Sequence, residues 1–188
     1  MYLHCDWHAN AHLRLTLDSI FVGNFQNEII WFYKGGGQSK ARFPRRHDTL
    51  LFYSKSKSWT FNYDIPELKT DYCRELRNEV AIRKQNGQKK VYHWKGNPLG
   101  KMIEDVWEIP IINPVSKERL GYPTQKPEAL LKRIIVASSN PGDIVLDPFC
   151  GGGTTLSVAQ QLGRQWIGID VSQIAINLTL TRLHKVGA

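Results

Sequence analysis

Residues 144–155 read IVLDPFCGGGTT, and this stretch decides the fold. The apolar residues at its start predict a short buried strand, the three consecutive glycines predict a tight loop, and the threonines begin a segment with helical spacing that ends at Gly163. The next apolar run, Gln165–Ile169, predicts a second strand. A strand, a helix and another strand in so short a segment are typical of a parallel α/β sheet.

The glycine-rich loop is also a candidate ligand site. Glycines let a ligand approach the backbone closely, and the first turn of the following helix offers free N–H groups. Asp170 follows the second strand, 17 residues after Gly153, where a carboxylate can accept hydrogen bonds from both hydroxyls of a ribose. Together these features predict a nucleoside-binding crevice at the carboxyl ends of parallel strands; the alternative is a tight turn without a ligand.

Two common nucleotide-binding motifs are absent from this loop. It lacks the Gly-Lys-Ser/Thr that holds phosphates in a P-loop, and it lacks the Gly-x-Gly-x-x-Gly of dinucleotide folds. The pattern therefore disfavours a nucleoside triphosphate and NAD, but it does not identify the ligand.

Further elements are predicted on both sides of the loop. Apolar and aromatic runs predict strands over Tyr2–Cys5, Asn27–Tyr33 and Asp48–Ser54. Helices are predicted over 9–21, where the apolar residues have helical spacing, and over 126–139, 154–162 and 172–185, with Pro127 at a first helical position. Residues 72–85 lie in a mixed region without a clean period and can form a helix that carries Arg and Lys. We expect residues 1–57 and 123–188 to form two parts of one core, with 58–122 as a small insertion between them.

The charge is uneven along the chain. The formal net charge is +8, and residues 34–101 carry 16 basic against 6 acidic side chains. A basic segment on a nearly neutral body suggests a polyanionic partner, most simply nucleic acid, although a solvated basic surface would give the same pattern.

Other bulk features suggest an ordinary cytoplasmic protein. The three cysteines are scattered, which argues against a disulfide framework and a cysteine-based zinc site. His4, His8 and His12 cannot share one helix face, because His4 falls on a predicted strand, so we expect no metal site. No apolar run approaches the length of a membrane span, and the start of the chain is too polar for a signal peptide.

Several motifs resemble those of the β-class DNA amino-methyltransferases, which methylate the exocyclic amine of adenine or cytosine. The most specific are GYPTQKPE at 121–128, the DPFCGGGTT of the loop, Gly163–Arg164, and IGID at 167–170. The earlier segments LHCD (3–6), NEIIW (27–31) and HDTLLFYS (47–54) are similar to later sheet strands of that family, in the family's order.

The resemblance implies a Rossmann-like α/β core of circularly permuted order, an inserted recognition segment, and S-adenosylmethionine as cofactor. By this resemblance Phe149, Gly151 and Gly153 shape the adenosyl pocket, and Asp170 binds the ribose. Lys126 and Thr154 meet the methionine end, and Asp147 orders the loop or contacts the amino group of the cofactor.

The implied partner is double-stranded DNA. Arg42, Arg45 and Arg46 follow three glycines and are candidates for phosphate contacts, with a solvated loop as the alternative. Lys89 and Lys90 lie where the family has its target-recognition region, near Tyr92 and Trp94, although these aromatic residues can equally form a small core of the insertion.

One departure from the family concerns catalysis. The catalytic tetrapeptide Asp-Pro-Pro-Tyr, or its Ser-Pro-Pro-Tyr/Trp variant, lies upstream of the LHCD strand in the family and is absent here, so no catalytic residue is assigned. The strand that carries it lies centrally in the family's sheet, so we expect an incomplete sheet with unpaired edges. The hypotheses are a truncated or split enzyme completed by a second chain, an inactive DNA- or cofactor-binding remnant, and an RNA methyltransferase.

Overall fold

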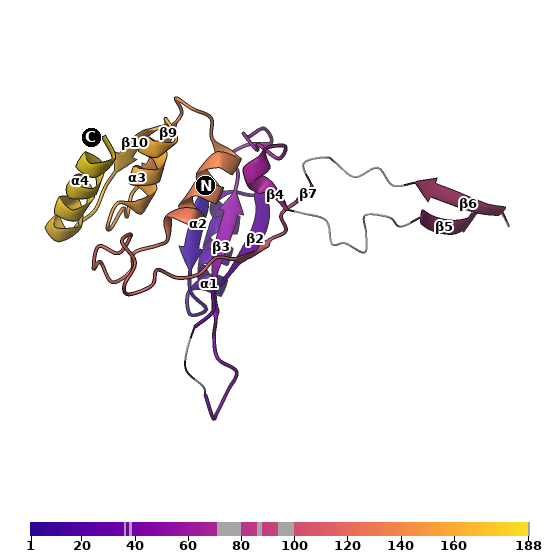
Figure 1. The fold of residues 1–188 in the computed structure, drawn as a ribbon, viewed down its shortest axis with the longest axis horizontal. Coiled ribbons are helices and arrows are strands. Elements are labelled where there is room, and N and C mark those ends of the chain that lie inside the picture. Colours follow the sequence, from indigo (N-terminus) through magenta and orange to yellow (C-terminus); the bar gives the residue numbers. More distant parts are fainter. Residues whose placement is uncertain (36, 38, 71–79, 86–87, 94–99, 188) are drawn as a thin grey trace. The chain divides into compact units, whose positions relative to one another are not determined.

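The computed structural model describes the chain except for residues 36, 38, 71–79, 86, 87, 94–99 and 188 (Figure 1). It divides into two compact units, one formed by Met1–Asn62 and Asp105–Ala188 and the other by Tyr63–Glu104. The smaller unit lies inside segment 58–122, where an insertion was expected. Within the described part, no helix is long and apolar enough to cross a membrane.

A four-stranded sheet forms one half of the larger unit. Its strands, in the order β1-β3-β2-β8, are Tyr2–Cys5, His47–Tyr53, Phe25–Phe32 and Val106–Glu108. Strand β3 runs antiparallel to β1 and β2, and β8 runs parallel to β2. Because β3 lies between two strands and under helices, its residues from Thr49 onward are all buried, which explains their nearly continuous apolar character.

Helix α1 (Asn10–Ile20) covers one face of this sheet. Its Leu17 packs with Cys5, Leu51 and Tyr53 in a buried cluster. The Tyr53 hydroxyl donates a hydrogen bond of 2.7 Å to Asp18 on the same helix. Burial raises the pKa of Tyr53 to about 12, so this hydroxyl stays protonated and the bond persists at neutral pH.

The second half of the larger unit contains the glycine-rich loop. Strands β9 (Ile144–Asp147) and β10 (Gln165–Gly168) pair in parallel, and helix α3 (Thr154–Gln161) connects them. Helix α4 (Gln173–Gly187) follows β10. This βαβ arrangement confirms the predicted parallel α/β fold.

Helix α2 (Glu128–Ser138) contacts both halves. Its Ile135 packs with α3 and with Val145 and Trp166, which belong to β9 and β10. At its other side Ser138 shares a hydrogen bond of 2.8 Å with the Tyr2 hydroxyl, and the Arg133 guanidinium lies 5.1 Å from the centre of the Trp107 ring. One helix therefore sets the position of the two-stranded sheet against the four-stranded one (Figure 1).

The opposite face of the two-stranded sheet is apolar and exposed. Alternation along β9 and β10 turns one set of side chains toward α2 and α3 and the other set away from them. The outward set is between 49 and 61% exposed and comprises Ile144, Leu146, Ile167 and, just after β10, Ile169. Among the described strands, β9 pairs only with β10 and β1 pairs only with β3, so each has one edge without a partner strand in the described part.

The smaller unit consists of short elements. They are the 3₁₀ helix η1 (Pro66–Leu68) and strands β4 (Lys69–Thr70), β5 (Val80–Gln85), β6 (Gln88–His93) and β7 (Lys101–Met102). Strands β5 and β6 form an antiparallel hairpin, and β4 pairs with β7. The helix predicted over 72–85 is wrong at its end, because residues 80–85 pair with β6 in an antiparallel hairpin. Residues 72–79 lie outside the described part.

The start of α2 also differs from the prediction. Pro127 is the N-cap residue, with an extended ψ of 141°, and the helix begins at Glu128. The Glu128 amide donates a hydrogen bond of 2.7 Å to the Glu118 carboxylate, which satisfies one of the free N–H groups of the first turn. An acceptor supplied from a preceding loop therefore fixes the helix start.

Replacing Leu51 by alanine tests the sheet core. Leu51 is 0% exposed, so Leu51→Ala should lower the free energy of unfolding by about 2–5 kcal/mol through lost burial and the cavity left behind. The matched control Leu15→Ala, at an exposed position on α1, should change it by less than about 0.5 kcal/mol. Urea denaturation followed by circular dichroism measures both, and equal effects would contradict the assigned core.

Candidate cofactor and substrate site

The glycine-rich loop has a specific backbone shape. Gly151 and Gly153 adopt left-handed conformations with φ of 52° and 70°. A Cβ atom at Gly153 would lie 2.6 Å from the Thr179 hydroxyl oxygen, so a side chain there would meet both strain and a collision. The Thr179 hydroxyl in turn donates to the Gly151 carbonyl at 2.9 Å. Helix α4 therefore packs directly against the loop and holds its curvature.

Asp170 fastens the loop to the end of β10. One carboxylate oxygen accepts the Gly151 amide at 2.8 Å, and the other accepts the Ser172 amide at 2.8 Å. The hydrogen bonds from the Ser172 and Gly151 amides hold the pKa of Asp170 below its ordinary value. The carboxylate is therefore ionised at neutral pH, and each oxygen keeps a further lone pair for a ligand.

Asp147 and Phe149 form the other side of the loop. The Asp147 carboxylate accepts the Phe149 amide at 3.1 Å, which is a local turn of the Asx type. The Phe149 ring is 83% exposed, although it follows directly on a strand. The loop thus presents a phenyl ring and two carboxylates at the carboxyl edge of the parallel strands.

A buried arginine connects this loop to three helices. Arg182 of α4 pairs with the Glu128 carboxylate of α2 at 2.6 Å. The same guanidinium donates to the Thr154 hydroxyl at 3.0 Å and to the Gly152 carbonyl at 3.4 Å. Such a cation is tolerated inside a protein only when its donors are used, and here they hold the starts of α2 and α3 against α4.

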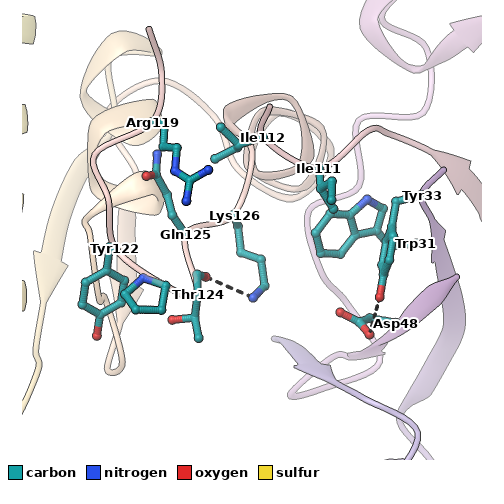
Figure 2. A pocket seen from close by; sticks show the side chains of 11 residues that line it. Trp31, Tyr33, Asp48, Ile111, Ile112, Arg119, Tyr122, Thr124, Gln125 and Lys126 are labelled. Atoms are coloured by element: carbon teal, nitrogen blue, oxygen red, sulfur yellow. Dashed lines mark hydrogen bonds between the residues drawn. The ribbon is translucent and has the colours of Figure 1, made fainter. Parts of the chain in front are cut away.

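A second feature of the site is a cavity of about 350 Å³ beside the loop. Figure 2 shows it between two groups of side chains. One group comes from segment 111–126 before α2, and the other comes from the ends of β2 and β3. The lining residues are Trp31, Tyr33, Asp48, Ile111, Ile112, Arg119, Tyr122, Pro123, Thr124, Gln125 and Lys126.

Asp48 is the acidic residue of this cavity lining. It accepts the Tyr33 hydroxyl at 3.2 Å and lies 3.0 Å from His4 Nε2. Burial, and then the nearby Lys126 ammonium, lower the pKa of His4, so its ring is neutral at pH 7 and donates Nε2–H to the carboxylate. Tyr33 and His4 therefore fix the orientation of the carboxylate.

Lys126 lies across this cavity and donates a hydrogen bond of 3.2 Å to the Thr124 carbonyl (Figure 2). Burial lowers the pKa of its ammonium, while Asp48 acts in the opposite direction. A Cβ at Gly151 would lie 2.9 Å from the Tyr122 ring, so Tyr122 belongs both to the cavity wall and to the contact surface of the loop. The cavity and the loop are therefore adjacent.

The structure brings most of the predicted cofactor residues together. Asp147, Phe149, Gly151 and Gly153 form the loop, and Asp170 is bonded to it. Lys126 lies in the neighbouring cavity. The Thr154 side chain is buried against Arg182, so its role at the methionine end of a cofactor stays a prediction.

The predicted DNA-contacting residues lie on two separate segments. Arg42, Arg45 and Arg46 belong to the loop between β2 and β3. Lys89 and Lys90 belong to β6 in the smaller unit, where they pair in register with Lys84 and Arg83 of β5. Their contacts with DNA stay predictions.

Sequence reasoning missed Arg182 and Asp48. For Arg182 a signal exists, because it falls on the same helical stripe as the buried Ala175 and Thr179, and a charged residue on a buried stripe needs a partner. For Asp48 the signal is weaker, because only the folded sheet brings it beside His4 and Tyr33.

Residues 1–180 match the model of a protein family that is described as DNA methylase. The chain is 41% identical over 162 residues to the type II methyltransferase M1.MboII of Moraxella bovis, covering 81% of this chain and 60% of that protein. It is 41% identical over 162 residues to the DNA adenine methyltransferase YhdJ of Escherichia coli (strain K12), covering 84% and 52%. The chain thus spans about half the length of the curated relatives it matches.

Solved structures agree on the fold. A complex of M1.HpyAVI with SAM superimposes with a TM-score of 0.64 at 24% identity, covering 97% of this chain and 73% of that one. The cytosine-N4-specific PvuII DNA methyltransferase gives 0.62 at 15% identity, covering 94% and 60%. At these identities the likeness shows a common fold.

Replacing Arg182 tests the link between loop and helices. Arg182→Met keeps roughly the length of the side chain but leaves the Gly152 carbonyl and the Glu128 carboxylate without their donor. The free energy of unfolding should therefore fall by about 2–3 kcal/mol. Lys185→Met, on the exposed face of the same helix, should have little effect. Thermal unfolding followed by calorimetry distinguishes the two variants. An unchanged stability of Arg182→Met would show that the buried pair does not hold the loop.

Proposed function

The chain belongs to the DNA methylase family, and on that premise we propose that it is part of an enzyme that methylates an exocyclic amino nitrogen of adenine or cytosine in double-stranded DNA, with S-adenosylmethionine as methyl donor. The observation that carries the proposal is the loop at the carboxyl ends of β9 and β10, where the Asp170 carboxylate is fixed by two backbone amides. The scattered cysteines suit a cytoplasmic location.

The residues of the loop fit the adenosine part of such a donor. The remaining lone pairs of Asp170 can accept two ribose hydroxyls, and the exposed Phe149 ring offers an apolar face for a base. Asp147, already oriented by the Phe149 amide, can accept an amino group.

The methionine end of the donor would lie toward Lys126. Its ammonium stands beside the Thr124 carbonyl and suits a carboxylate. When bound, S-adenosylmethionine supplies an electrophilic methyl group on a sulfonium. Thr154 supports this end indirectly, since Arg182 holds its hydroxyl at the start of α3.

We place the acceptor amine in the cavity between Lys126 and Asp48. The indole of Trp31 and the phenol of Tyr33 provide aromatic walls, and the oriented Asp48 carboxylate can accept a hydrogen bond from an exocyclic amine. A base reaches such a pocket only after it leaves the stack of the duplex. Adenine and cytosine both carry such an exocyclic amine, so both remain candidates.

Contacts with the duplex would come from the basic segments. Arg42, Arg45 and Arg46 suit phosphate oxygens, which arginine forks bind well. Strands β5 and β6 place Arg83 opposite Lys90 and Lys84 opposite Lys89, and like charges in register destabilise a hairpin unless counter-charges approach. A two-stranded ribbon with such charges suits the major groove of DNA.

A matched pair of carboxylate replacements tests the cofactor site. Asp170→Asn removes the charge and one acceptor, so the affinity for S-adenosylmethionine should fall by about tenfold or more, which corresponds to the loss of one charge-assisted hydrogen bond. Asp143 lies before β9, at the end of that strand away from the glycine loop. Asp143→Asn should therefore leave the affinity for S-adenosylmethionine unchanged. Calorimetric titration measures both, and equal affinities in the two variants would contradict the assignment.

We further propose that another polypeptide segment, in the same protein or in a second chain, covers the exposed apolar face of β9 and β10. The support is the row of four exposed aliphatic side chains on a parallel pair, since parallel sheets are normally covered on both faces. The unpaired edges of β9 and β1 also support this proposal, because an unpaired strand edge can bind a further strand.

Methyl transfer with and without that segment tests the idea. The purified chain should transfer little label from S-adenosylmethionine to duplex DNA, and co-production with the part of M1.MboII that the chain does not match should raise transfer. Leu146→Asp should prevent this gain, whereas Leu15→Asp on exposed α1 should not. Robust transfer by the chain alone would overturn the proposal, and transfer to RNA instead would identify an RNA methyltransferase.

A further inference from the structure

The loop between β2 and β3 has internal bonds that give it a defined form. The Tyr33 amide donates to the Arg46 carbonyl at 2.9 Å and closes its base. The Arg46 guanidinium reaches across the loop and donates to the Gly37 carbonyl at 2.7 Å. The Ser39 hydroxyl accepts the Ala41 and Arg42 amides at 3.3 and 3.2 Å. These bonds leave the residues from Arg42 to Arg45 projecting from a closed base.

Phe43 stands on this projecting part and is 94% exposed. Single exposed apolar residues are common on protein surfaces and need no explanation by themselves. This one differs in its neighbours, because Arg42 precedes it and Pro44–Arg45–Arg46 follows it. Pro44 restricts the backbone next to the ring, so less conformational freedom is lost when the ring binds a partner.

Arg45 anchors the loop to the segment that follows β1. Its guanidinium lies 3.5 Å from the centre of the Trp7 ring, and Trp7 in turn lies against His8, with ring centres 3.5 Å apart. A stack of this kind holds the Arg45 guanidinium on the Trp7 ring, while its outer edge can still meet an anion. A cationic group and an aromatic ring are therefore stacked at Arg45, two residues along the chain from the exposed Phe43.

We propose that Phe43 is a wedge that stacks on or inserts between bases of double-stranded DNA, while Arg42, Arg45 and Arg46 neutralise the neighbouring phosphates. The inference rests on the proposed function, because it takes duplex DNA as the partner. The occupant follows from charge complementarity: a polyanion matches the arginines, and only a polyanion with planar apolar faces also matches the ring. Phenylalanine and proline are typical wedges at unstacked base steps.

The role follows from the energetics of base extrusion. A base must leave the duplex before its amine can reach a pocket, and unstacking a step costs a few kcal/mol. A phenyl ring that replaces the lost stacking partner offsets part of this cost. Phe43 is thus a positioning residue that holds an opened step, and it takes no part in bond making.

Binding to two duplexes tests the wedge without knowledge of the recognition sequence. One duplex is intact, and the other carries a single abasic site, where a gap already exists and no stacking must be broken. The chain should bind the abasic duplex at least about tenfold more tightly, because the unstacking of one step no longer opposes binding. Phe43→Ala should abolish this preference, and Phe43→Trp should retain it, because an indole stacks at least as well as a phenyl ring.

Two further variants separate the wedge from simple charge. Arg42→Ala should weaken binding to both duplexes equally and reduce the slope of log affinity against log salt concentration by about 1. Phe43→Ala should leave that slope unchanged. Val22→Ala serves as the control, since Val22 is 76% exposed but precedes the other end of β2.

The outcomes distinguish the wedge from the proposed function. If the chain binds duplex DNA and Phe43→Ala keeps the preference for the abasic site, the wedge is wrong while the DNA-methylase proposal stands. If the chain binds neither duplex, or binds duplex RNA more tightly than both, the wedge and the DNA part of the proposed function are both overturned.

Discussion

The arrangement of the half of the larger unit that contains the glycine-rich loop depends on the buried guanidinium of Arg182. It joins the start of α2 through Glu128, the start of α3 through Thr154, and the glycine loop through the Gly152 carbonyl. Removing a cation of this kind leaves several polar groups without partners, which costs more than the pair itself contributes. The shape of the loop is therefore a property of four elements held by one side chain, rather than of its glycines alone.

Asp170 extends the same arrangement to the sheet. Its two oxygens accept amides from the loop and from the turn before α4, so the carboxylate that is predicted to hold the ribose is also a structural brace. This double use explains why an acidic residue at the end of β10 is ionised and oriented before any ligand arrives. Such preorganisation reduces the cost of ordering the site on binding.

Local patterns predicted most of the core, and tertiary contacts explain where they failed. The strands that begin at Ile144 and Gln165 were predictable because apolar runs, glycines and turn residues agree with one another. The start of α2 was displaced by one residue because Glu118 supplies an acceptor from a distant loop. The helix expected near Ile82 became a strand because β6 pairs with it. Asp48 was missed because only folding brings it beside His4 and Tyr33. Arg182 could have been found from the buried stripe of its helix, but its partners Glu128 and Thr154 lie far away in the sequence.

The glycine loop, held by Arg182 and Asp170, is the proposed binding site of S-adenosylmethionine. The most direct measurement is a titration of the ¹⁵N-labelled chain with this compound, followed by amide NMR. The account predicts saturable shifts of the Gly151, Gly153 and Ser172 amides, with the β5–β6 hairpin unchanged. Shifts that avoid the loop and Ser172, or no shifts from a folded chain at millimolar ligand, would contradict it.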